Sequence, residues 1–136
     1  MVSVFRRRAT VPDPPAWFPG SYPEYVCYTE LERQGYRPDE DFDYQSPLLG
    51  GRLVLGGLEA DFLFTRPPLL IINVNSRYWH NDRPQPAGRT QQARDIYARQ
   101  QFAGLGYTLV LIDDDDLLND PAFYVSEALS YRDHSE

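Results

Sequence analysis

The side chains that could do chemistry are few in this chain of 136 residues. It has one cysteine, Cys27, two histidines and 13 basic residues, all of them arginines. Because lysine is absent, a Schiff-base lysine, a P-loop lysine and a lysine general base are excluded. Arginine cannot replace them, since its guanidinium stays protonated near neutral pH. The single cysteine also forbids an internal disulfide, and with two histidines it matches no usual zinc-site spacing.

The composition is that of an ordinary globular domain, with 42% hydrophobic and 24% charged residues. The net charge of −7 makes the chain a poor candidate for non-specific DNA coating, because phosphate neutralisation needs an excess of basic residues. No apolar run approaches the roughly 18 residues of a membrane span, and the N-terminal residues lack the pattern of a signal peptide. We therefore expect no membrane partner and a cytoplasmic location, while a local basic groove for DNA stays open.

Residues 1–20 are predicted to form an extended arm ahead of a single domain at 21–136. Four prolines keep this segment extended and remove backbone donors: Pro12, Pro14, Pro15 and Pro19. Trp17 and Phe18 lie among them. Either the two rings cover the domain's own surface, or they anchor the arm on a protein partner or a second copy of the chain.

The first predicted helix begins at a capping box, in which Ser21 is followed three residues later by Glu24. Gly35 is expected to end this helix. Cys27, which lies in its middle, is expected to be a small buried hydrophobe.

Apolar runs and their periodicity predict the other elements. Strands are expected at 42–45, 58–64, 69–75 and 107–112, and helices at 90–104 and 122–131, while the glycine pairs around the short apolar run 53–55 indicate turns and close backbone approach. In the 58–64 strand, alternation places three residues on one face: Ala60, Phe62 and Phe64. In the 90–104 helix, four residues are spaced for one buried face: Ala93, Ile96, Tyr97 and Ala103. The acidic run 113–116 is interpreted as a solvated strand end and a helix cap. This order predicts a mixed α/β sandwich around one small sheet.

Several short motifs occur in a fixed order over residues 22–131: Pro23-Glu24, Tyr44-Gln45-Ser46-Pro47, Gly50-Gly51-Arg52, Gly56-Gly57, Asp61-Phe62, Ile72-Asn73-Val74-Asn75, Tyr78-Trp79-His80, Asp95, Gly106-Tyr107 and Asp115-Asp116-Leu117. Their order and spacing resemble the PD-(D/E)XK nuclease-like proteins, in particular the compact branch that includes very-short-patch repair endonucleases. The resemblance implies a restriction-endonuclease-like α/β core, a small mixed β-sheet flanked by helices in the order α-β-β-β-α-β-α.

In that family, a carboxylate on a middle strand and a second on the next strand hold Mg²⁺, and a Lys or Gln two residues later orients the attacking water. The resemblance places the first carboxylate at Asp61, the second acid at Asn73 and the Lys or Gln at Asn75. Because an amide replaces a carboxylate at position 73, Mg²⁺ binding at Asp61 should be severely weakened. Other residues could supply a ligand or a base: Glu24, His80, Asp82 and Asp95. Gln45 and Arg52 are the candidates for substrate contacts.

These candidates also have structural interpretations. Asp61 could hydrogen-bond a turn amide in the glycine-rich hairpin, and Asn73 and Asn75 could pair with each other and with a helix amide as a satisfied polar patch. His80 could pair with a carboxylate, and Arg52 could bind an acidic neighbour in place of a phosphate.

We therefore expect a nuclease-fold module that no longer cuts and acts in binding or scaffolding, without a cofactor. Small, acidic, arginine-only proteins of this kind resemble phage-encoded ones, so by analogy a virion role such as head–tail assembly is expected. The alternative is an active Mg²⁺-dependent endonuclease for nicked, mismatched or branched DNA, which would use Asp61 with a non-standard second ligand.

Overall fold

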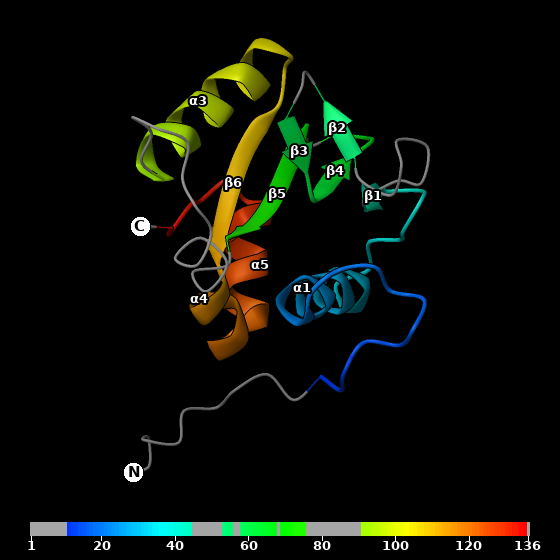
Figure 1. Ribbon diagram of the computed structural model, residues 1–136. Helices are drawn as coiled ribbons and strands as arrows, with labels where there is room; N and C mark the ends of the chain where they lie inside the picture. The colour runs from blue at the N-terminus through cyan, green and yellow to red at the C-terminus, as the bar shows by residue number, and fades with distance from the viewer. Residues whose placement is uncertain (1–10, 45–52, 56–57, 68, 76–90, 136) are drawn as a thin grey trace.

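The computed structural model describes residues 11–44, 53–55, 58–67, 69–75 and 91–135, without the side chains of 53–55, 58 and 91 (Figure 1). In chain order its elements are α1 (Tyr22–Arg33), β1 (Phe42–Tyr44), β2 (Leu53–Leu55), β3 (Leu58–Ala60), β4 (Phe62–Phe64), β5 (Leu70–Asn75), α3 (Gln91–Gly104), β6 (Thr108–Asp113), α4 (Asp114–Asn119) and α5 (Pro121–Leu129). No helix within these ranges has the length and apolar character needed to cross a membrane.

Four of the strands form a mixed sheet in the order β1-β4-β5-β6. The first three are antiparallel to their neighbours, whereas β5 and β6 are parallel and run in register from Leu70 opposite Thr108 to Asn75 opposite Asp113. A parallel pair needs a crossover connection, and α3 supplies it. β2 and β3 form a separate antiparallel pair. The predicted small mixed sheet is therefore confirmed.

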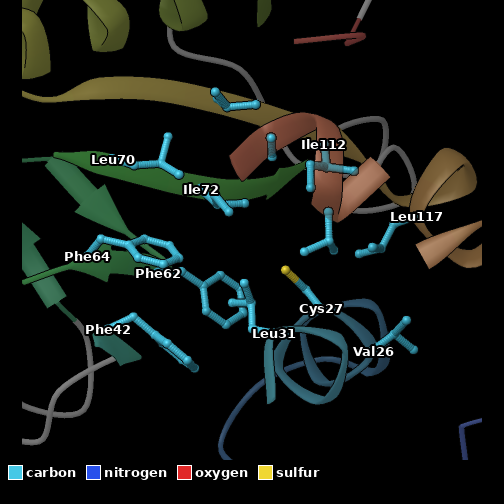
Figure 2. Packing of buried hydrophobic residues seen from close by; sticks show 13 residues of the cluster. Val26, Cys27, Leu31, Phe42, Phe62, Phe64, Leu70, Ile72, Ile112 and Leu117 are labelled. Atoms are coloured by element: carbon cyan, nitrogen blue, oxygen red, sulfur yellow. The ribbon is translucent and has the colours of Figure 1, made fainter. Parts of the chain in front are cut away.

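Helices cover both faces of the sheet, and β5 supplies residues to both. Its Leu70 and Ile72 belong to a large core under α1, α4 and α5, whereas Ile71 points to a smaller core under α3 (Figure 1). This division follows from the period of two in a strand, which sends neighbouring side chains to opposite faces. Figure 2 shows Cys27 and Leu31 of α1 within the large core, and Cys27 is fully buried as predicted.

α1 begins and ends where the sequence predicts. The Ser21 hydroxyl accepts from the Glu24 N–H at 3.3 Å, and the Glu24 carboxylate accepts from the Ser21 N–H at 3.4 Å, which completes the capping box. After the last turn, Gly35 takes a φ of 98°, a left-handed conformation that glycine adopts without a steric penalty.

The buried face predicted for α3 is wrong, although its bounds agree with the predicted 90–104. Ile96 and Tyr97 are 54% and 44% exposed, and the helix instead packs through Ala98 and the fully buried Phe102. Ala98 and Phe102 are four residues apart and so lie one turn above the other. The buried Phe102 thus determines which face of the helix packs on the sheet, and the spacing of the other apolar residues does not.

Residues 11–20 of the predicted arm lie against α1 and β1. Phe18 is 6% exposed, and its ring stacks on Tyr44 with the centroids 4.9 Å apart and the planes 13° from parallel. The Tyr22 hydroxyl donates to the Val11 carbonyl at 2.6 Å. Trp17, by contrast, is 65% exposed. Of the two rings, Phe18 covers the chain's own surface, and Trp17 stays the candidate for an external partner.

The two neighbouring aromatic residues should therefore differ in their contribution to stability. Phe18→Ala removes a buried ring and should lower the free energy of unfolding by about 2 kcal/mol. Trp17→Ala removes a larger but mostly exposed ring and should cost less than about 1 kcal/mol. Urea denaturation of both variants measures the difference, and equal effects would contradict this packing of the arm.

Candidate functional site

The strand predicted at 58–64 is broken at Asp61, which separates β3 from β4. Ala60 therefore joins the small core, whereas Phe62 and Phe64 join the large one, so the single face predicted for these three residues is wrong. Asp61 itself is 8% exposed. The break changes the direction of its side chain, and the pattern of alternation ends there.

Three hydrogen bonds to and from side chains hold this break against β5. The Asp61 N–H donates to Asn73 Oδ1 at 2.7 Å, and Asn73 Nδ2 donates to the Glu59 carbonyl at 3.1 Å. In return, the Val74 N–H donates to Asp61 Oδ2 at 2.9 Å. We call this set of bonds the Asp61–Asn73 clamp. It takes the place of main-chain pairing where the β4–β5 ladder ends at Phe62.

The clamp explains why an amide stands at position 73. Asn73 offers one acceptor and one donor, and the backbone at the break needs one of each. A carboxylate would satisfy the Asp61 N–H but could not donate to the Glu59 carbonyl. Position 73, where the resemblance predicts a second acid, thus has a structural role. Asn73 bonds to the backbone of the break, whereas the structural interpretation expected Asn75 and a helix amide as its partners.

Asn75 lies at the end of β5, opposite Asp113 at the end of β6. Alternation along β5 places Asn75 on the same face as Asn73, which is the face under α3. Asp113 is 6% exposed, although the acidic run was predicted to begin as a solvated strand end. It is the N-cap of α4, but its side chain makes no capping bond. Asp114, Asp115 and Asp116 occupy the first turn, where the helix dipole favours negative charge.

Glu24 brings a second carboxylate to the side of the sheet under α1. Its Oε1 accepts from the Ser21 N–H and, at 2.5 Å, from the Tyr44 hydroxyl. Burial raises the pKa of the Cys27 thiol, and the charges of Asp61, Glu24 and Glu30 raise it further. The charges of Asp61 and Glu24, which come from separate elements, therefore both disfavour the ionised Cys27 thiol. Sequence reasoning missed Tyr44, since only the pairing of β1 with β4 places its hydroxyl.

Mg²⁺ is bound in proteins mainly by carboxylate oxygens, and Asp61 and Glu24 each offer such a group. Within the described ranges, no group of three His, Cys, Asp or Glu side chains could hold a metal ion. A third protein ligand would have to come from elsewhere in the chain. Four predicted residues lie outside the described residues: Gln45, Arg52, His80 and Asp82.

Asp95 is not part of this pair. It lies on α3, across the sheet from α1, and lines a hollow of about 240 Å³ together with Gln92, Ile96, Arg99 and Ser135. The structure thus brings Asp61 into direct contact with Asn73. Asp95 lies on the α3 side of the sheet, whereas Glu24 lies on the α1 side.

Comparison with known proteins gives a likeness of fold. No family model matches the chain, and no curated protein matches it. Among solved structures, it is similar to the catalytic domain of the homing endonuclease I-Bth0305I, with a TM-score of 0.52 and 18% identity, over 79% of this chain and 90% of that one. At this identity the likeness concerns the fold alone. The chain therefore has a nuclease-like α/β fold, in which a four-stranded mixed sheet lies between helices.

Proposed function

We propose that this chain is a metal-dependent endonuclease in which Asp61 and Glu24 hold the divalent ion. The observation that carries the proposal is a pair of ordered carboxylates, Asp61 at the break after β3 and Glu24 in the first turn of α1. Each carboxylate is oriented by a hydrogen bond, Asp61 by the Val74 N–H and Glu24 by the Tyr44 hydroxyl. Likeness to an endonuclease catalytic domain supports it.

The clamp removes one argument against activity. If Asn73 had replaced a metal-binding carboxylate, the missing charge would imply that the chain no longer binds the ion and no longer cuts DNA. Its amide instead bonds to the backbone at the break, so its identity is explained without any earlier ligand role. The second carboxylate then comes from Glu24. A bound divalent ion would offset the phosphate charge and activate the attacking water. His80, which the sequence offers as a general base or a phosphate donor, lies outside the described residues.

The second candidate is an inactive nuclease fold that binds or scaffolds, for example in a phage virion. It is favoured by the finding that no group of three potential metal ligands occurs among the described residues. The net charge of −7 also disfavours tight binding to DNA phosphates. Under this candidate, purified protein cuts no DNA with any divalent ion.

Cleavage assays separate the two candidates. The wild type is incubated with supercoiled, mismatched and branched DNA in Mg²⁺ and in Mn²⁺, beside Asp61→Asn and Glu24→Gln. We expect cleavage by the wild type and a loss of about 100-fold or more in Asp61→Asn, which corresponds to roughly 2.7 kcal/mol of activation free energy. Gln also serves in a capping box, so Glu24→Gln removes the charge while keeping the helix start.

Asp115→Asn is the matched control, because it makes the same chemical change at an exposed position on α4. Its activity should equal that of the wild type. If no protein in the set cuts any substrate and the wild type binds no Mn²⁺, the nuclease proposal is wrong and the scaffold candidate stands.

A further inference from the structure

We infer that Phe18 and Gly20 of the N-terminal arm, acting through Tyr44, position the Glu24 carboxylate. This inference rests on the proposed function, because it gives the three residues a role only if Glu24 holds the ion. They are positioning residues: they touch Glu24 or its partner and take no part in the reaction themselves. The arm would then be part of the site.

Tyr44 is the residue in direct contact with Glu24. Its hydroxyl donates to Glu24 Oε1 at 2.5 Å, across 20 residues of sequence. The same oxygen accepts from the Ser21 N–H, so one bond from the helix start and one from β1 fix it from two directions. Hydrogen bonds to a charged carboxylate are stronger than those between neutral groups, and they limit the rotation of the side chain.

The ring of Tyr44 is itself held by aromatic neighbours. Phe18 stacks on it, Phe62 lies with its centroid 4.8 Å away, and Tyr28 meets it edge-on at 5.8 Å. Aromatic pairs at these distances pack with a preferred geometry, so the direction of the hydroxyl is set by the surrounding rings. Phe62 directly follows Asp61 in the chain. The same packing therefore supports the elements that carry both carboxylates.

Gly20 of the arm lies close to both the Tyr44 hydroxyl and the Glu24 carboxylate. A Cβ at this position would overlap the Tyr44 hydroxyl and Glu24 Oε1, and would lie 3.1 Å from Cε2 of Phe18. Any side chain at position 20 must therefore push the hydroxyl and the carboxylate aside. Alanine at position 20 would therefore displace the hydroxyl and the carboxylate from their present positions.

The test uses Tyr44→Phe, which keeps the ring and removes only the hydroxyl. We expect its melting temperature to stay close to that of the wild type, while the Mn²⁺ dissociation constant rises about tenfold, as expected for one hydrogen bond to a charged group. Gly20→Ala should weaken Mn²⁺ binding at least as much. Mn²⁺ binding is measured by electron paramagnetic resonance, and kcat and KM are measured on the best DNA substrate.

Tyr25→Phe is the matched control. Tyr25 also packs on the Phe18 ring, with the centroids 4.9 Å apart. The substitution removes a tyrosine hydroxyl, as Tyr44→Phe does. It should bind Mn²⁺ like the wild type. A double-mutant cycle then asks whether Tyr44 acts through Glu24. In a Glu24→Gln background, Tyr44→Phe should have little further effect on Mn²⁺ binding or kcat.

The outcomes separate this inference from the proposed function. A wild type that neither binds Mn²⁺ nor cuts DNA overturns both. If the wild type is active and Tyr44→Phe matches it, the positioning role alone is wrong. If Tyr44→Phe loses binding equally with and without Glu24, Tyr44 does not act through that carboxylate, and the inference is likewise overturned.

Discussion

Asn73→Glu should destabilise the fold by about 3–5 kcal/mol, and adding Asn75→Lys should not make the protein a better nuclease. A carboxylate at position 73 cannot donate to the Glu59 carbonyl, and the loss of this exposed hydrogen bond costs about 1 kcal/mol. The new charge would also lie beside Asp61, which is 8% exposed, and an uncompensated charge there adds several kcal/mol. Urea denaturation, monitored by circular dichroism, measures this loss of stability.

Asn75→Lys alone is the control for this pair of substitutions. Asn75 lies opposite Asp113, and opposite charges across a strand pair are mildly stabilising. The single variant should therefore unfold at about the same urea concentration as the wild type. If the double variant were as stable as the wild type and cut DNA faster, Asn73 would be a decayed catalytic position, and the structural role of the clamp would be wrong.

Local signals in the sequence predicted the elements well. The start of α1 depends on Ser21 and Glu24, three residues apart, and its end depends on Gly35, so neither needs knowledge of the rest of the fold. Features that depend on distant partners were mispredicted. The break at Asp61 exists because Asn73, twelve residues later, bonds to it. The rotation of α3 depends on which side chain fills the space beside the sheet, and Phe102 does so.

The same distinction applies to the candidate site. The resemblance placed Asp61 and Asn73 in one site, and they are in direct contact. It could not show that the amide serves the backbone, because that depends on where the β4–β5 ladder stops. Tyr44 reaches Glu24 only because β1 pairs with β4 at the edge of the sheet, next to the start of α1. No spacing rule in the sequence encodes that contact.

Asp133→Ala should lower the free energy of unfolding at neutral pH by about 3 kcal/mol, a large effect for a residue near the C-terminus. β6 is the edge strand of the four-stranded sheet, and Asp133 Oδ2 accepts from the Leu111 N–H of this edge at 3.0 Å. The same oxygen accepts from Arg99 of α3 at 3.0 Å. The carboxylate thus ties the C-terminal residues to a strand and a helix, and its removal leaves a buried N–H unsatisfied.

The effect should depend on pH in a defined direction. Burial alone would raise the pKa of Asp133, but hydrogen bonds from Leu111, Ser135 and Arg99 outweigh it and lower the pKa. A carboxylate with a lowered folded pKa stabilises the fold above its unfolded value of about 4, and this contribution is lost as the pH falls further. Hydrogen bonds from Arg132, then from His134, likewise lower the pKa of Glu127 to about 2.

Melting curves of the wild type and Asp133→Ala between pH 7 and pH 2 test this argument. Their melting temperatures should differ most above pH 5 and converge towards pH 2. At low pH, protonation removes the Asp133 charge from the wild type, and the substitution has already removed that charge from the variant. Asp115→Asn, at an exposed position, should follow the wild type throughout. A difference that stayed constant with pH would mean that Asp133 stabilises the tail through packing and not through its charge.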